Sequence, residues 1–273
     1  MRVRLRPVRS ILLALACVSL LGSFVVLDAD AQPRAIRVAL FRSPGVARDA
    51  LDATETLLRA TRGYELTVLG PNDVRAGRLA GHDVVVFTGG RGSIQGRFLG
   101  EDGRARVRDF VRDGGGYVGI CAGAYMALQG EAEFHKIAFV AGRHATGDAW
   151  RRGVATTWVE PLDGSPRAPL HYANGPIFAP EVVEGLDAYV PLALFRADVY
   201  SEAHGTGPGE MPGTPAVVAA RYGRGRLLLW SPNPVLEGPD EPAQPELFLR
   251  SLRFVDRDAP LPAELGWRDA FGE

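Results

Sequence analysis

After residue 34, the first half of the chain alternates between short apolar runs and segments with helical spacing of apolar residues. The predicted strands cover residues 35–41, 64–69, 84–87 and 117–120. Segments 44–59 and 107–111 place their apolar residues at the spacing of an amphipathic helix. Continuous apolar runs of this length suit strands that are buried on both faces. Strands that alternate with helices predict an α/β fold with a doubly wound, mostly parallel sheet.

The second half of the chain has a different pattern. Many Gly and Pro residues interrupt residues 137–222, and short β-type runs lie between them. These runs are residues 154–159, 189–194 and 216–220. We expect them to elaborate one edge of the sheet. Residues 226–230 resume the core pattern, and residues 246–255 predict a closing amphipathic helix. Residues 32–273 therefore read as one domain.

The first 31 residues have the pattern of a secretory signal peptide. Four arginines and no acid occur in the first ten positions, and residues 11–27 are almost wholly apolar. Ala29-Asp30-Ala31 has the A-x-A form of a cleavage site. We predict cleavage after Ala31 and a secreted or periplasmic protein. Two alternatives stay open. The first is an uncleaved membrane anchor, since the apolar run is only somewhat shorter than a membrane span of about 20 residues. The second is a lipoprotein, since Cys17 lies in a faint lipoprotein-like site.

Charge and cysteine content exclude several classes of function. A net charge of −1 gives no electrostatic basis for binding nucleic acid. Once the leader is removed, Cys121 is the only cysteine, so no intramolecular disulfide can form. The spacing of His, Cys, Asp and Glu residues matches no metal site, and no Gly-rich loop has a nucleotide-binding pattern. We predict no metal, no cofactor, and membrane contact only through an uncleaved leader.

The most specific chemical pattern in the chain surrounds Cys121. Gly119-Ile120-Cys121-Ala122-Gly123 follows an apolar strand-like run and precedes a helix-like run. A strand, a nucleophile between glycines and a helix form a nucleophile elbow. The glycines permit a sharp turn. The N–H groups at the start of the helix are expected to favour the thiolate. The alternative is an inert, buried thiol.

Three stretches resemble, in order and spacing, the class I glutamine amidotransferase-like fold, which is flavodoxin-like. These stretches are residues 84–90, 114–127 and 222–234. Residues 114–125 look most like the branch found as the N-terminal domain of eukaryotic biotin–protein ligases and as stand-alone bacterial proteins. Residues 171–178 resemble the Tyr-x-Gly-Gly-x-Phe region of that branch, with Asn174 in place of the first glycine.

The resemblance implies a chemistry for each part of the site. The Cys121 thiolate would attack an amide or ester carbonyl, a histidine would carry the proton, and an acid would orient the histidine. Backbone N–H groups would hold the developing oxyanion. One of them would come from Gly89 or Gly90, and the other from Ala122.

The chain departs from the family at the end of the last core strand. Active members have His-Pro-Glu there, and this sequence has Asn233-Pro234-Val235. An asparagine amide cannot accept a proton at any relevant pH, and valine cannot orient a base. Glutaminase activity is therefore not expected. Asn233 either binds a polar ligand or caps the turn between its two prolines.

Two functions remain open from the sequence. The first is a non-hydrolytic member that binds a small ligand or a protein partner in the old active-site cleft. The cleft would bring together Gly89, Gly90, Cys121 and Asn233 at the carboxyl ends of the parallel strands. The alternative is a cysteine-dependent amide or ester hydrolase, or an acyl transferase, with a relocated base. The candidate bases are His171 and His144, which lie in the inserted β segments.

Overall fold

The computed structural model describes residues 34–145, 149–262 and 264–272. The predicted signal peptide, with Cys17, lies outside these residues. Within them, nine strands form one mixed sheet in the order β2-β1-β3-β4-β11-β10-β9-β6-β7. The first five are parallel to one another: β2 (Tyr64–Leu69), β1 (Ile36–Phe41), β3 (Val84–Phe87), β4 (Gly116–Ile120) and β11 (Gly225–Trp230).

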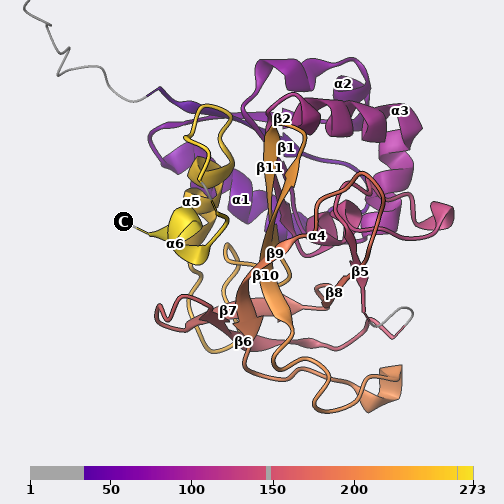
Figure 1. Ribbon diagram of the computed structural model, residues 1–273, viewed down its shortest axis with the longest axis vertical. Coiled ribbons are helices and arrows are strands. Elements are labelled where there is room, and N and C mark those ends of the chain that lie inside the picture. Colours follow the sequence, from indigo (N-terminus) through magenta and orange to yellow (C-terminus); the bar gives the residue numbers. More distant parts are fainter. Residues whose placement is uncertain (1–33, 146–148, 263, 273) are drawn as a thin grey trace, which may run out of the picture. The chain divides into compact units, whose positions relative to one another are not determined.

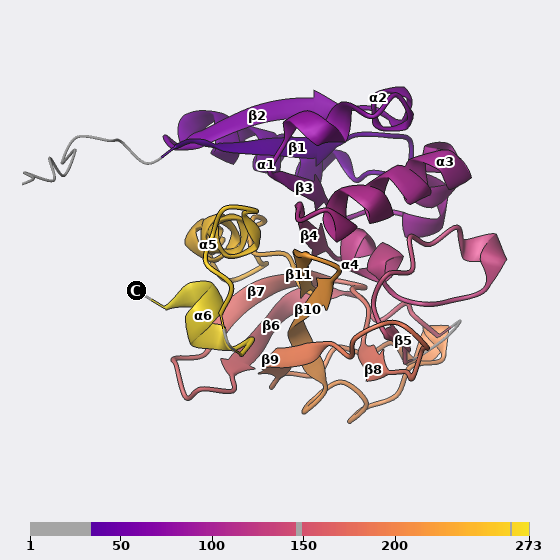
Figure 2. The same cartoon turned by 45° about the horizontal axis from the view of Figure 1, so that its top comes forward.

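The antiparallel strands elaborate one edge, as the sequence predicts. They are β10 (Pro215–Tyr222), β9 (Val190–Phe195), β6 (Val154–Pro161) and β7 (Ala168–Ala173). Figure 2 shows them on the side of the domain away from β1 and β2. A separate antiparallel pair joins β5 (Gly142–His144) and β8 (Phe178–Pro180).

Helices cover both faces of the parallel strands (Figure 1). They are α1 (Arg48–Ala60), α2 (Pro71–Arg75), α3 (Gly92–Arg112), α4 (Ala122–Ala127), α5 (Pro245–Val255) and α6 (Trp267–Phe271), with 3₁₀ turns η1 (Arg78–Gly81), η2 (Ala132–Phe134) and η3 (Glu202–His204). Alternate residues of β3 enter different cores. Val84 and Val86 pack in the core that includes α1, α5 and α6, and Val85 and Phe87 pack in the core that includes α2, α3 and α4. The predicted doubly wound α/β fold is confirmed.

The structure differs from the sequence expectation in helix α3 and in the strands β5, β7 and β8. Helix α3 begins at Gly92, long before the predicted segment 107–111, and Gly100 interrupts it at φ +73°. Its four glycines lower the helical signal, and one of them, Gly96, lies so close to His135 that a Cβ would meet its carbonyl oxygen at 2.0 Å. Strand β7 and the pair β5–β8 lack the continuous apolar runs that marked the others.

The described residues contain no helix with both the length and the apolar character needed to cross a membrane.

Candidate functional site

Cys121 stands alone between β4 and α4, with φ 52° and ψ −104°. This conformation is costly for a residue with a side chain and persists only where the surroundings enforce it. The Cys121 N–H donates to the Trp230 carbonyl of β11 (2.8 Å), and the Cys121 carbonyl accepts the Tyr125 N–H of α4 (3.0 Å). The backbone is thus held on both sides of the residue, and the side chain is presented at the carboxyl end of β4.

Glycines allow α4 to lie directly against the strands. A Cβ on Gly123 would come within 2.0 Å of the Phe87 carbonyl oxygen of β3. A Cβ on Gly119 would approach the Gly123 and Ala124 backbone at 2.8 Å. Both distances are far inside van der Waals contact, so the G-x-C-x-G spacing reflects this close packing of α4 on β3 and β4.

Two backbone N–H groups converge on the Cys121 sulfur. They belong to Gly90 and Ala122, which are two of the oxyanion donors expected from the resemblance. Burial raises the pKa of the Cys121 thiol, and these two hydrogen bonds lower it by less. The Ala122 N–H at the start of α4 lowers the thiol pKa, as expected from the sequence, but desolvation outweighs it and the pKa is raised overall.

The Gly89–Gly90 loop is tied to the loop before α1. The Ala47 N–H donates to the Gly89 carbonyl (3.0 Å), and the Arg91 N–H donates to the Gly45 carbonyl (2.7 Å). Gly90 has φ +127°, and a Cβ there would lie 2.2 Å from the Gly45 oxygen. Only glycine fits at Gly90, and this conformation turns its N–H toward Cys121.

The end of β7 covers another side of the sulfur. The Cys121 thiol donates to the Ala173 carbonyl, with 3.5 Å between sulfur and oxygen. The next residue, Asn174, has φ +55°, a left-handed conformation that asparagine tolerates better than most residues. Its Oδ1 accepts the N–H groups of Arg152 (2.7 Å) and Gly153 (2.8 Å). Asn174 thereby keeps a turn that glycine can make in the related branch, and it fixes the strand end against Cys121.

Asn233 lies just beyond β11, where the family has its histidine. Its side chain is buried, and its Oδ1 accepts the N–H groups of Val235 (2.8 Å) and Leu236 (3.3 Å). Its own N–H donates to the His171 carbonyl (2.7 Å). The amide oxygen is used to close the turn, which is the capping arrangement weighed from the sequence.

His171 lies on β7, opposite Thr156 of β6. Its Nδ1 is buried and makes no hydrogen bond within the described residues. His171 and Ala173 are two positions apart on the strand, so their side chains lie on the same face of it. Among the residues that the structure describes, the Cys121 sulfur forms hydrogen bonds with backbone groups and with no histidine.

His144 lies at the end of β5, beside α4. Its ring packs edge-on against Tyr125, with 6.1 Å between centroids, and its Nδ1 accepts the Ile177 N–H at 3.2 Å. Burial lowers the pKa of His144 to about 4. The ring is therefore neutral at physiological pH, and its Nδ1 is engaged by the backbone.

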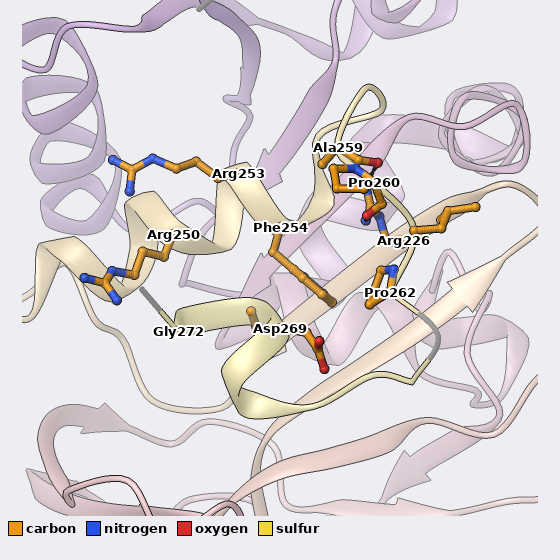
Figure 3. A pocket seen from close by; sticks show the side chains of 11 residues that line it. Arg226, Arg250, Arg253, Phe254, Ala259, Pro260, Pro262, Asp269 and Gly272 are labelled. Atoms are coloured by element: carbon orange, nitrogen blue, oxygen red, sulfur yellow. Dashed lines mark hydrogen bonds between the residues drawn. The ribbon is translucent and has the colours of Figure 1, made fainter.

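Two cavities formed by described residues are not lined by Cys121. One, about 630 Å³, lies between α5, α6 and the start of β11 (Figure 3). The guanidinium of Arg226 in this cavity already donates to backbone carbonyls of Asp256, Ala259 and Pro260. The other cavity, about 490 Å³, borders β8 and includes Glu210. Glu210 pairs with the buried Arg152 guanidinium. These charged groups therefore serve the fold.

Among the described residues, no cluster of three or more His, Cys, Asp or Glu side chains has the arrangement of a metal site. The sequence missed two contributors to the Cys121 surroundings, the Ala173 carbonyl and Gln95. A backbone oxygen from a distant strand leaves no sequence signal. Gln95 follows the Gly89–Gly90 loop by about one helical turn. In the sequence, only this proximity indicated that its side chain lies near Cys121.

Comparison with known proteins supports the family resemblance noted in the sequence. Residues 37–143 match the family described as "Biotin-protein ligase, N terminal". The matched segment contains the Gly89–Gly90 loop and the Cys121 elbow and ends before His171 and Asn233. This match and the α/β fold confirm that the chain resembles the biotin–protein ligase N-terminal branch of the class I glutamine amidotransferase-like proteins. No curated protein gave a significant match.

Solved structures resemble this chain at low sequence identity. The cytoplasmic protein STM3548 from Salmonella typhimurium is 12% identical, with a TM-score of 0.52 over 82% of this chain and 100% of that chain. The cytoplasmic protein STM1381 from Salmonella typhimurium LT2 is 16% identical, with a TM-score of 0.43 over 71% of this chain and 87% of that one. A putative ThuA-like protein from Parabacteroides merdae is 14% identical, with a TM-score of 0.42 over 72% and 79%. Only the first supports the fold assignment.

Proposed function

We propose that this chain is an exported, non-hydrolytic glutamine amidotransferase-like protein that binds a small ligand in the cleft around Cys121. The observation that carries the proposal is the state of the sulfur. It is a half-buried thiol that donates a hydrogen bond to the Ala173 carbonyl, and desolvation raises its pKa. Asn233 stands where a base would be needed, and its amide oxygen closes a turn. Acyl transfer requires a proton carrier, and neither Asn233 nor the Ala173 carbonyl can act as one.

The class of ligand follows from the donors that remain. The N–H groups of Gly90 and Ala122 both donate to the Cys121 sulfur. Two such N–H groups suit an oxygen that carries negative charge, as in a carboxylate, or partial negative charge, as in an amide carbonyl. We therefore propose a ligand with a carboxylate or carbonyl group, such as an amino acid, biotin or a short peptide. Its oxygen would take the place of the sulfur as acceptor.

A ligand screen with a protection assay tests this binding function. The mature protein, residues 32–273, is screened by thermal shift against amino acids, biotin and small peptides. A ligand of the cleft should raise the melting temperature and also slow alkylation of Cys121 at the same concentration. A ligand that raises the melting temperature without protecting Cys121 binds elsewhere. If no ligand in these classes protects Cys121, the proposed ligand class is wrong.

Cys121 should react with iodoacetamide at pH 7 more slowly than a small free thiol. Its labelling profile should have a midpoint above the ordinary thiol pKa of about 8.5. The reason is burial, which disfavours the thiolate. The control is the same protein in urea, in which Cys121 should react at the rate of a free thiol. Folded protein that labels faster than the urea sample would contradict a non-hydrolytic role.

The strained elbow favours a second candidate, a cysteine-dependent amide or ester hydrolase or acyl transferase. Holding Cys121 at φ 52° costs about 1–3 kcal/mol, and such strain is common at catalytic nucleophiles. His171, with its unpaired Nδ1, is the candidate base. This candidate requires hydrolysis of amides or thioesters that Cys121→Ala and His171→Ala both abolish. Hydrolysis of that kind would overturn the first proposal.

Export is proposed from the leader alone. Expression of the full chain in a bacterium should give a periplasmic protein whose first residue is Gln32, because Ala31 ends an A-x-A site. Its measured mass should equal that of residues 32–273. Mass spectrometry of fractionated cells checks this. Replacing both Ala29 and Ala31 by Gln should leave the leader attached. A wild-type protein that keeps its leader in the membrane fraction would establish an anchored protein instead.

A further inference from the structure

The peptide between Gly89 and Gly90 has a different partner at each end. Its N–H, on Gly90, is one of the two donors to the Cys121 sulfur. Its carbonyl, on Gly89, accepts two hydrogen bonds, from the Ala47 N–H (3.0 Å) and from the Gln95 side-chain amide (3.3 Å). A trans peptide is planar, so its N–H and its carbonyl point in opposite directions. Holding the Gly89 oxygen therefore determines where the Gly90 N–H points.

Without hydrogen bonds to the Gly89 carbonyl, the peptide between Gly89 and Gly90 could rotate more easily than most peptides. It lies between two glycines, so no Cβ on either side resists a flip. A flipped peptide would turn the Gly89 carbonyl toward the sulfur and remove the donor. The orientation needed at Cys121 therefore depends on what binds the Gly89 oxygen.

Gln95 is suited to this task by its position and its orientation. It lies one turn into α3 and is fully buried, and its Nε2 faces the carbonyl oxygens of Gly89 (3.3 Å) and Gly45 (3.5 Å). The reverse amide orientation would place Oε1 against these two acceptors, so the network determines which atom is the donor. The Oε1 atom is buried and has no partner within the described residues. Only the donating half of the amide is therefore used.

We infer that Gln95 is a positioning residue, whose side-chain amide holds the Gly89–Gly90 peptide so that the Gly90 N–H points toward the Cys121 sulfur. Gln95 acts through the Gly89 carbonyl and does not touch the ligand. The inference rests on the proposed function only in assigning the Gly90 N–H to a ligand oxygen. Its effect on the sulfur is independent of any ligand.

The pH dependence of Cys121 alkylation tests the inference on the mature protein. Gln95→Met keeps a similar volume and removes the donor. Loosening a hydrogen bond to the thiolate should move the midpoint of the labelling profile up by roughly half to one pH unit. Below the midpoint, labelling should slow about threefold to tenfold.

Tyr64→Phe is the matched control. It also removes one side-chain donor to a backbone carbonyl, that of Leu249 (3.0 Å), but at the far edge of the sheet. It should lower the melting temperature and leave the labelling profile of Cys121 unchanged. If Gln95→Met leaves the profile unchanged as well, the inference is wrong and Gln95 only packs. If Tyr64→Phe shifts the profile equally, the effect is general loosening and the inference is again wrong.

The outcomes separate this inference from the proposed function. A shifted profile in Gln95→Met, together with a wild-type protein that binds no carboxylate or carbonyl ligand, keeps the positioning role and rejects the ligand. An unchanged profile, together with ligand protection of Cys121 in the wild type, rejects the positioning role and keeps the ligand.

Discussion

Gly123→Ala should destabilise the protein by about 3 kcal/mol, the upper end of the cost of overpacking a core. A methyl group at this position would lie 2.0 Å from the Phe87 carbonyl oxygen, and that oxygen belongs to the backbone of a central strand. Helix α4 must then move away from β3, and the Ala122 N–H moves with it. Urea denaturation should show the loss of stability, and Cys121 alkylation should show a changed pH profile.

Gly81→Ala is the matched control for this substitution. Gly81 ends η1, and a methyl group there would have no heavy atom within 4 Å. Its backbone lies outside the left-handed region that favours glycine. The change should therefore be neutral or slightly stabilising, since it restricts only the unfolded chain. Equal stability of Gly123→Ala and Gly81→Ala would show that α4 does not pack on β3 at the observed distance.

Asp83→Asn should lower the free energy of unfolding by about 1–3 kcal/mol, the range for losing hydrogen bonds to a charged group at a buried position. The two arginines that pair with Asp83 are partly exposed, so no buried charge is left uncompensated. The Asp83 carboxylate is fully buried at the start of β3. It accepts hydrogen bonds from Arg34 (2.5 Å), from the Arg37 guanidinium (2.7 Å) and from the Arg37 backbone N–H (2.9 Å). The substitution removes the carboxylate that Arg34 and Arg37 share and loosens the first residues of the described domain, although Arg34 keeps its pairs with Asp256 and Asp258.

Glu55→Gln is the control for Asp83→Asn. Glu55 pairs with Arg59 at 2.7 Å on the exposed side of α1. Exposed pairs of this spacing contribute only about 0.3–0.5 kcal/mol. Urea denaturation at pH 7 should therefore separate the two variants clearly. Similar losses in both would mean that Asp83 is not buried among the arginines as observed.

The same contacts predict how stability depends on pH. Burial raises the pKa of Asp83, but the hydrogen bonds from Arg37 and Arg34 outweigh it and hold the pKa well below its ordinary value. Because the folded-state pKa is depressed, this stabilisation is complete above the unfolded-state pKa of about 4 and is lost as the pH falls below it. The loss of stability between pH 7 and pH 3 should be smaller in Asp83→Asn than in the wild type.

The core of the fold was predictable from local pattern. Strands β2 and β3 have the predicted bounds. Every residue of β3 is buried, and a strand of this kind is apolar at every position. Strand β2 lies at the edge of the sheet and alternates partly buried with exposed residues. The elbow was predictable for a related reason. A strand, a nucleophile between glycines and a helix are contiguous in sequence, so the geometry of Gly119, Cys121 and Gly123 is encoded within five residues.

The character of the site was not encoded locally. Ala173, whose carbonyl accepts the hydrogen bond from the thiol, is 52 positions from Cys121. Strand β7 has no continuous apolar run that would predict it from the sequence. The direction of the thiol pKa depends on how much water these distant residues exclude, and the sequence pattern near Cys121 suggested the opposite direction.

The sequence by itself determined where the chain turns, which strands are buried and which residue stands at the elbow. Periodicity and glycine spacing express constraints that act within a few residues. Only the tertiary structure decided that Asn233 closes a turn, that the sulfur is a protonated donor and that Gln95 holds the Gly89 carbonyl. Those outcomes depend on desolvation and on contacts between segments far apart in the chain, which no local pattern records.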